Sequence, residues 1–311
     1  MRITFVINAS SVDAVETLRQ EIERLRGEGH EVHPHLTFEG GDAHRLAYRA
    51  AATGSALIVA AGGDGTINEV VNGLHDYFAE VGSGAAGSGG VEHPRLGIIP
   101  LGTANDLASA LGIPDELPGA VDAAVNGAVV ESDIATVNGR CFINVSTGGF
   151  GAEATEESSA EIKRTLGPLA YVITGVKKFV SLESSPARFS GDEPIYEGPF
   201  LLFAVGNSRQ TGGGNLLTPR ADLTDGLLDV CIVREMPRME FLTLLPDLRA
   251  GNHLEHDGVI YRRLRTLLVE SEEALSVNAD GEPLRERRFE YGISPHRLRL
   301  MTPRHSLTAA P

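Results

Sequence analysis

Long apolar runs are scarce in this sequence. No stretch approaches the ~20 consecutive apolar residues that a membrane-spanning helix requires. The opening segment MRITFVINAS holds one Arg and a short apolar run, without the longer apolar core and small-residue cleavage site of a signal peptide. We therefore expect residues 2 to 8 to form a strand and the protein to be cytoplasmic.

Cysteine and basic residues are also few. The two cysteines, Cys141 and Cys231, stand far apart in apolar runs and have no CxxC partner, which indicates buried thiols rather than a disulfide or a metal site. The 27 Lys and Arg are outnumbered by 42 Asp and Glu, giving a formal charge of −15. This balance disfavours nucleic acid as a partner, because phosphate backbones bind clustered Lys and Arg. A nucleotide substrate stays compatible with it, since one cation and a few backbone amides can hold a triphosphate.

Two patterns of secondary structure divide the chain. At 311 residues it exceeds the ~250 residues at which single cores usually stop growing, so we expect two domains. Strand and helix patterns alternate up to residue 130, which predicts a parallel, Rossmann-like α/β domain at 1–130. The rest predicts a mainly antiparallel, β-rich sandwich domain at 131–292, and residues 293–311 could return to either domain.

Individual elements follow from the same patterns. Asn138-Gly139 is a strong hairpin signal between two β-rich runs. The expected helices are 11–26, 42–52, the segment after Gly65, and regions near 166–182 and 238–248; the expected strands are 31–37, 55–63, 95–100, 199–206, 227–234, 259–269 and 274–278.

Glycine-rich turns follow two of the predicted parallel strands. In GGDGT, the glycines at 62, 63 and 65 allow backbone N–H groups to approach an oxygen-rich ligand, and the helix that begins near Thr66 directs its positive end to the same place. The turn PLGTAND at 100–106 follows the next strand, and turns at the carboxyl ends of neighbouring parallel strands line one crevice. A tight turn capped by Asp64 is the plainer interpretation. The chain contains no P-loop, and no GxGxxG stands between a predicted strand and a helix, where a dinucleotide fingerprint requires it.

These turns carry a resemblance to known kinases. GGDGT resembles the ATP-binding turn of NAD kinases, 6-phosphofructokinases and diacylglycerol or sphingosine kinases, and PLGTANDLA narrows the resemblance to the diacylglycerol-kinase catalytic-domain family. Four further segments agree in order and spacing: HLTFEGGDA at 35–43, CFINVSTGGFGAEAT at 141–155, ADLTDGLLDV at 221–230 and VNADGEP at 277–283. Over nearly its full length the chain resembles bacterial lipid kinases of the YegS type, which implies an NAD-kinase-like α/β domain followed by a β-sandwich domain.

The resemblance implies an ATP site in the first domain and a metal and a base in the second. Phosphoryl transfer to an alcohol needs a cation that neutralises phosphate charge and a carboxylate near the attacking hydroxyl. By resemblance, the cation is Mg²⁺, with Ca²⁺ as the alternative, and Glu282 is the proton acceptor. The ATP-binding residues implied are Thr37, Gly62, Gly63, Asp64, Gly65, Thr66, Ile67, Asn68 and Thr103; the metal ligands are the Asp225 carboxylate and the main-chain oxygens of Asp222 and Leu227; and Asp106 and Asp133 are supporting acids.

Plainer interpretations of these acids remain. Asp225-Gly226 could be a structural hairpin corner, Glu282 an exposed loop acid, and Asp133 the start of a strand. The acids together would repel one another without a cation, which supports the metal.

The resulting functional hypothesis is an ATP- and Mg²⁺-dependent lipid kinase in phospholipid metabolism. The acceptor would be a lipid with a free hydroxyl, and diacylglycerol, phosphatidylglycerol and sphingoid-like alcohols stay open. Two alternatives are an NAD kinase, which shares GGDGT, and a catalytically idle regulator that binds nucleotide or lipid.

Basic clusters in the second domain could support transient contact with the membrane surface during turnover. Arg262, Arg263 and Arg265 form one cluster, and Arg285, Arg287 and Arg288 form the other. Solvated strand faces are the plainer interpretation of both.

The sequence departs from the family pattern in two places. NASS at 8–11 replaces the usual Asn-Pro-x-Ser-Gly stretch, which leaves the phosphate contacts of that loop open. The Gly/Ser-rich segment 82–90 predicts a flexible surface insertion without a catalytic role.

Overall fold

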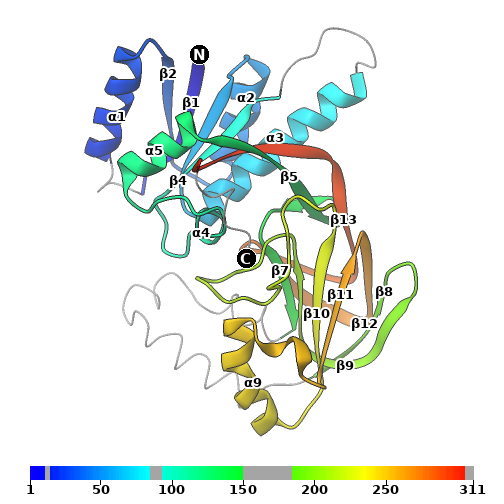
Figure 1. Cartoon of the computed structure of the whole chain (residues 1–311). Coiled ribbons are helices and arrows are strands. Elements are labelled where there is room, and N and C mark those ends of the chain that lie inside the picture. Colours follow the sequence, from blue (N-terminus) through cyan, green and yellow to red (C-terminus); the bar gives the residue numbers. More distant parts are fainter. Residues whose placement is uncertain (11–14, 85–92, 150–183, 305–311) are drawn as a thin grey trace. The chain divides into compact units, whose positions relative to one another are not determined.

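A computed structural model describes residues 1–10, 15–84, 93–149 and 184–304 (Figure 1). The chain forms two compact units: unit 1 comprises the described residues of Met1–Ile134, Arg140–Ile143 and Ser294–Pro311, and unit 2 those of Ala135–Gly139 and Asn144–Ile293. The helix expected near 166–182 and the end of the segment CFINVSTGGFGAEAT lie outside the described residues.

Unit 1 is built on a parallel sheet. Its strands lie in the order β4 (Arg95–Pro100), β3 (Leu57–Gly62), β1 (Arg2–Asn8), β2 (Glu31–Thr37), and every neighbouring pair is parallel. All six residues of β3 are buried, as expected for a parallel strand covered on both faces. The last apolar run also joins this unit, where Arg299 and Leu300 of β13 (Glu282–Thr302) pair in parallel with β4.

Helices cover this sheet in two pairs. Figure 1 shows α1 and α5 together and α2 and α3 together, with the strands between the two pairs. The helix bounds are α1 Val15–Gly27, α2 Asp42–Ala52, α3 Asp64–Gly84, α4 Asp106–Ala110 and α5 Leu117–Asn126. One expectation was wrong in part: α3 continues through Gly84, so residues 82–84 of the predicted flexible segment 82–90 are helical, and residues 85–90 lie outside the described residues. Adding residues to a formed helix costs little, since each brings a further hydrogen bond.

Unit 2 is antiparallel, which together with unit 1 confirms the predicted fold class. Its main path is β11 (Val259–Leu264), β10 (Leu228–Arg234), β9 (Pro194–Gly206), β7 (Val145–Gly149), β12 (Thr266–Ala279) and the first part of β13, and β8 (Ser185–Ser190) pairs with both β9 and β12. The predicted turn at Asn138-Gly139 joins β5 (Ala128–Val137) to β6 (Arg140–Phe142), with φ angles of 48° and 80°.

One predicted strand is two strands. The predicted strand 259–269 divides at Arg265, because Leu264 pairs with Leu228 of β10 whereas Thr266 pairs with Gly292 of β13. The chain therefore crosses from one sheet neighbour to another within two residues.

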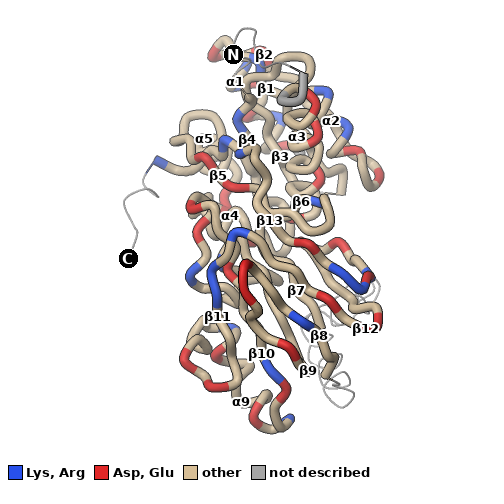
Figure 2. Tube along the Cα trace, turned by 90° about the vertical axis from the view of Figure 1, so that its right-hand side faces the viewer, with Lys and Arg blue, Asp and Glu red and all other residues tan. Residues whose placement is uncertain are grey.

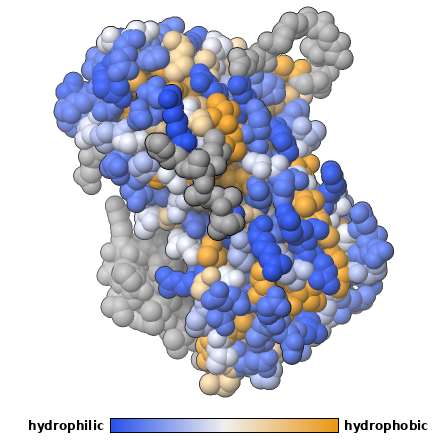
Figure 3. All heavy atoms as spheres, viewed as in Figure 1, coloured by the Kyte–Doolittle hydropathy of each residue, from blue (hydrophilic) through white to orange (hydrophobic). Residues whose placement is uncertain are grey.

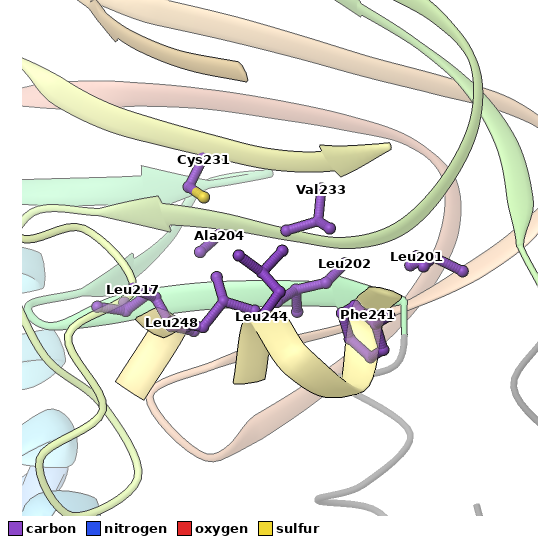
Figure 4. Packing of buried hydrophobic residues seen from close by; sticks show 10 residues of the cluster. Leu201, Leu202, Ala204, Leu217, Cys231, Val233, Phe241, Leu244 and Leu248 are labelled. Atoms are coloured by element: carbon purple, nitrogen blue, oxygen red, sulfur yellow. The ribbon is translucent and has the colours of Figure 1, made fainter. Parts of the chain in front are cut away.

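A helix closes the core of unit 2. α9 (Arg238–Ala250) directs Phe241, Leu244 and Leu248 toward β9 and β10, where they pack near Leu202 and Cys231 (Figure 4). Cys231 and Cys141 are both buried and free, as predicted, and burial raises the pKa of each thiol to about 12. In the described part of the chain no helix combines the length and apolar character needed to cross a bilayer.

Candidate functional site

The carboxyl edge of the parallel sheet gathers most of the predicted ATP-binding residues. Asn8 at the end of β1 is in register with Thr37 at the end of β2, and Gly62 at the end of β3 is in register with Pro100 at the end of β4. The Asn8 side chain donates a hydrogen bond of 3.0 Å to Thr66 Oγ1, which fastens β1 to the first turn of α3. Thr103 is exposed in the loop that follows β4.

Two glycine loops cross at this edge. A Cβ atom on Gly102 would lie 2.5 Å from Gly63 Cα, and a Cβ atom on Gly62 would lie 2.5 Å from Thr66 Oγ1. None of these three glycines has a φ angle in the left-handed region. Close contacts, rather than φ, therefore require glycine here: Gly63 and Gly102 approach each other's backbone, and Gly62 approaches the Thr66 side chain.

Gly65 differs from its neighbours. It is exposed, its φ is not left-handed, and outside its own helix and chain neighbours no described atom lies within 4 Å of a Cβ atom placed on it. Nearby, Asn68 Nδ2 is buried and has no hydrogen-bond partner among the residues that the structure describes, although Asn68 Oδ1 accepts from Asn72. Open space at the start of a helix and an unused donor fit the phosphate oxygens of a nucleotide. Ile67 contributes to the core instead, since it is fully buried and its N–H donates to Gly63 O.

Asp64 carries a carboxylate that the fold leaves partly unsatisfied. It is the first residue of α3, and its Oδ1 atom is buried with no hydrogen-bond partner in the described structure. Burial raises the pKa of Asp64, the nearby charge of Asp106 raises it further, and the backbone amides of Leu107, Asp106 and Asn105 act in the opposite direction. A bound cation would stabilise the ionised form, so this site fits a metal that arrives with a nucleotide.

Asn105 holds the second glycine loop in shape. It adopts a left-handed conformation with φ 52°, its Oδ1 accepts from Gly102 N at 3.0 Å, and its Nδ2 donates to Gly102 O at 3.1 Å. Asp106 follows as the first residue of α4 and is buried. Sequence reasoning named Asp106 but did not assign this role to Asn105.

Asp133 has an arginine partner. It lies on β5 with 1% of its surface exposed, and its Oδ1 is 2.8 Å from Arg297 Nη2 of β13. Its charge is therefore balanced within unit 1 by a residue that the sequence analysis did not single out.

The predicted metal loop is a turn whose carboxylates are already bound. Gly226 has φ 71°, which confirms the turn before β10. Asp222 Oδ1 accepts from Thr224 N at 2.9 Å and from Thr224 Oγ1 at 2.8 Å. Asp225 Oδ1 accepts from Leu227 N at 2.9 Å, and its Oδ2 accepts from Arg263 Nη2.

This arrangement of the 222–227 loop does not fit a cation. Both oxygens of Asp225 are engaged, and no group of three or more His, Cys, Asp or Glu side chains suited to a metal occurs among the residues that the structure describes. The loop could take a metal only after Arg263 leaves Asp225.

A buried acid, Asp229, lies near this loop and shares the partner Arg263 with Asp225. Asp229 of β10 accepts a hydrogen bond of 2.7 Å from the Tyr261 hydroxyl, and its Oδ2 is 3.5 Å from Arg263 Nε. Burial raises the pKa of Asp229, and the Tyr261 hydrogen bond and the Arg263 charge oppose this rise. The sequence analysis did not name Asp229 or Tyr261 as site residues; the alternation of strand faces was the signal that could have paired them.

Glu282 follows a rigid two-residue turn. Asp280 and Gly281 have φ angles of 49° and 96° and join β12 to β13, with Ala279 paired to Glu282. The Asp280 carboxylate accepts the N–H groups of Asn144 and Val145 at 3.1 Å, and Asn278 Oδ1 accepts Gly281 N at 2.8 Å. Glu282 is exposed beside this clamp.

Asp225 and Glu282 border the same edge of the unit 2 sheet without touching. The path across the sheet runs from β10 to β9 through the pair Asp229–Gly206, and from β9 to β7 through Gly206–Val145. It continues from β7 to β12 through Ser146–Ala279, and from β12 to β13 through Ala279–Glu282. Four strand spacings therefore separate β10 from β13, which at about 4.8 Å each is on the order of 15–20 Å. The predicted metal loop and the predicted base Glu282 thus lie along one edge of the sheet but are not ligands of one ion.

Both units match described families. The family "Diacylglycerol kinase catalytic domain" matches residues 2–137, and "YegS C-terminal NAD kinase beta sandwich-like domain" matches residues 144–302. "Probable lipid kinase YegS-like" from Pseudomonas aeruginosa (strain UCBPP-PA14) is 41% identical over 288 residues, which cover 93% of this chain and 90% of that protein. "Probable lipid kinase YegS" from Escherichia fergusonii is 37% identical over 301 residues, which cover 96% of this chain and 95% of that protein.

Solved structures share the fold. A chain from Bacillus anthracis strain Sterne superposes with a TM-score of 0.78 at 25% identity, covering 97% of this chain and 95% of the other. A second chain from that strain, described as a diacylglycerol kinase, has a TM-score of 0.69 at 21% identity, covering 97% of this chain and 96% of the other. With two family matches that span both units and relatives at 37% and 41% identity, the chain belongs to the YegS-like lipid kinase family.

Proposed function

We propose that the chain is an ATP- and Mg²⁺-dependent kinase that transfers the γ-phosphate to the hydroxyl of a lipid such as diacylglycerol or phosphatidylglycerol. The observation that carries this proposal is the glycine crossing at the carboxyl edge of β3 and β4, where Gly65 leaves open space and Asp64 keeps an unbonded carboxylate oxygen. Family membership supports the kinase chemistry, and two relatives carry the name of lipid kinases.

The residues of each unit would take separate parts of the reaction. Backbone N–H groups at the start of α3 would bind phosphate oxygens, and Asn68 Nδ2 would donate to the same ligand. Mg²⁺ would supply charge neutralisation for the phosphates, with Asp64 as a ligand available in unit 1. Glu282 would accept the proton of the lipid hydroxyl as its oxygen bonds to the γ-phosphorus and the bond between that phosphorus and the leaving ADP breaks.

Peripheral contact with a membrane would deliver the lipid. Figure 3 shows apolar residues scattered among hydrophilic ones on the displayed face, and large exposed apolar side chains include Phe38 at 83% and Met239 at 71% exposure. Two of the six arginines in the predicted basic clusters are held by carboxylates, since Arg263 pairs with Asp225 and Arg288 with Glu270. The other four arginines of these clusters would therefore provide the electrostatic attraction to anionic lipid.

The substitution Glu282→Gln tests the proposed base. With labelled ATP and a panel of lipid vesicles, loss of a general base should lower product formation by roughly 10²- to 10⁴-fold while the melting temperature stays unchanged. Glu286→Gln is the matched control, because Glu286 is exposed on the same strand, four residues further on. Full turnover by Glu282→Gln would refute this role for the residue.

The same reaction mixture separates the rival activities. If NAD replaces lipid as the phosphate acceptor, the chain is an NAD kinase. If ATP binds but no acceptor is phosphorylated, the chain is a nucleotide-binding regulator.

A further inference from the structure

Backbone groups on two sides hold the side chain of Asn72 in α3. The strand β6 lies beside α3 in unit 1 (Figure 2), and the N–H of its Cys141 donates to Asn72 Oδ1 at 3.2 Å. Asn72 Nδ2 donates to Asn68 O at 2.9 Å and to Cys141 O at 3.3 Å. A backbone N–H can only donate, and a carbonyl oxygen can only accept. The Asn72 amide therefore has one orientation, since its reversal would bring donor against donor and acceptor against acceptor.

The orientation of Asn72 determines that of Asn68. Side chains of an α-helix lean toward its N-terminus, and residues four apart lie one above the other, so the Asn72 side chain reaches that of Asn68. Asn72 Nδ2 donates to Asn68 Oδ1. If the Asn68 amide were reversed, two NH₂ groups would face each other. Asn68 therefore keeps its oxygen toward Asn72 and its Nδ2 atom on the other side.

This arrangement leaves Asn68 Nδ2 as a buried donor. Asn68 is 6% exposed, and the part of the chain that the structure describes offers no hydrogen-bond acceptor to its Nδ2 atom. A buried donor without an acceptor costs free energy. Gly65 lies three residues earlier on the same surface of α3, and it is exposed beside open space. An anionic oxygen at the start of this helix would supply the missing acceptor.

We infer that Asn72, held by the backbone of Cys141, is a positioning residue that sets Asn68 as a hydrogen-bond donor to an anionic oxygen of the ligand at the start of α3. The inference rests on the proposed function for the identity of this ligand, a nucleoside triphosphate. Asn72 acts through Asn68 and does not touch the ligand. A phosphate oxygen suits the place because it only accepts, whereas an N–H group of a ligand would face another donor.

The isosteric substitution Asn72→Asp tests this role. A carboxylate at position 72 still accepts from Cys141 N but cannot donate to Asn68 Oδ1, so the Asn68 amide should reverse and turn its oxygen toward the ligand. ATP affinity, measured by isothermal titration calorimetry, should fall roughly 10- to 100-fold, the range expected for a hydrogen bond to a charged group. Asn126→Asp is the matched control, because it adds the same charge at the exposed end of α5 and should leave ATP affinity within about twofold of the parent.

A double-mutant cycle separates positioning from charge repulsion and from a general loss of structure. In the Asn68→Ala background no amide remains to be reversed, so the addition of Asn72→Asp should change ATP affinity by less than about twofold. A loss of equal size in both backgrounds would mean that the new charge or a distorted helix weakens ATP binding, and it overturns the inference. Unchanged ATP affinity of Asn72→Asp overturns it as well.

A second substitution keeps the test valid if Asn72→Asp unfolds the chain. Thermal melting checks each variant, because a carboxylate at position 72 would face the carbonyl oxygens of Asn68 and Cys141. Asn72→Ala adds no charge, and alanine is favourable inside a helix. It frees the Asn68 amide to rotate, so the binding-competent orientation is only a fraction of the population and ATP binding should weaken about fivefold. The same loss in the Asn68→Ala background, or no loss at all, overturns the inference.

The outcomes separate this inference from the proposed function. If the parent chain binds ATP and the Asn72 variants bind it like Asn126→Asp, the inference fails and the proposed kinase stands. If the parent chain does not bind ATP, both fail. Lipid phosphorylation is judged independently by Glu282→Gln.

Discussion

Gly102→Ala should destabilise unit 1 at the crossing of the two glycine loops. The new Cβ atom would lie 2.5 Å from Gly63 Cα, whereas ordinary contacts begin at 3.4 Å, so one backbone must move by about 0.9 Å. It would also lie 2.9 Å from Asn105 Oδ1, the atom that accepts the N–H of Gly102.

Hydrogen bonds restrain the backbone of both glycine loops. Gly63 O accepts from Ile67 N at 3.1 Å within α3, and Gly62 O accepts from Leu101 N at 2.9 Å, so the crossing segments are tied together on both sides. Overpacking of this kind typically costs about 1–3 kcal/mol. For a chain of this size, each kcal/mol lowers the melting temperature by roughly 2–4 °C. Urea unfolding and thermal melting measure both quantities.

Gly65→Ala is the matched comparison. Gly65 lies in the same loop, yet nothing is within 4 Å of its added Cβ atom and its φ is not left-handed. Because it is inside α3, alanine should leave stability unchanged or raise it by up to ~1 kcal/mol. ATP affinity, measured by calorimetry, should nevertheless fall if phosphate occupies the open space. Equal stability of the two variants would refute the steric argument, and undiminished ATP binding by Gly65→Ala would refute the phosphate assignment.

Two further predictions concern pH and packing. Stability should fall as pH drops below about 6.5, because burial lowers the pKa of His75 and of His93 in the folded chain. The charge of His296 lowers both pKa values further, whereas Asp76 opposes the shift of His75 and Glu131 opposes that of His93. The unfolded chain therefore takes up protons that the folded chain does not, and the variant His75→Gln/His93→Gln should lose less stability with falling pH, as measured by urea unfolding. Phe241→Ala should cost about 3–5 kcal/mol, since this ring is 0% exposed between α9 and the sheet (Figure 4), whereas Met239→Ala, exposed at 71%, should change stability by less than ~0.5 kcal/mol.

Local signals in the sequence predicted the strands and turns well. The predicted strand 55–63 contains the buried strand β3 (Leu57–Gly62), because parallel strands are apolar on both faces, and Asn138-Gly139 is a turn in which both residues take positive φ. The same locality explains the error at Arg265, where a continuous strand-like run conceals a change of sheet partner. Composition alone does not record which strand a residue will pair with.

Pairings between distant residues were out of reach. Arg263 looked like one member of a solvated basic cluster, and only the register of β10 with β11 reveals that it faces Asp229. Likewise, Asp133 is balanced by Arg297 from the opposite end of the sequence. The change of sequence texture near residue 131 falls inside β5, which passes from unit 1 to unit 2 at Ile134 without a loop to mark the division.

Asp64 and Asp225 show why an acid in a glycine turn does not by itself identify a cation site. The charge that raises the pKa of Asp64 is another carboxylate, Asp106, whereas the backbone amides of Leu107, Asp106 and Asn105 lower it. Asp225 has Arg263, held in place by the buried Asp229. Backbone amides therefore stabilise the Asp64 carboxylate only in part and leave its Oδ1 atom unbonded in the described structure, while both oxygens of Asp225 are engaged by groups of its own unit. The unbonded oxygen of Asp64, and not the position of an acid in a glycine turn, is therefore the feature that favours a cation.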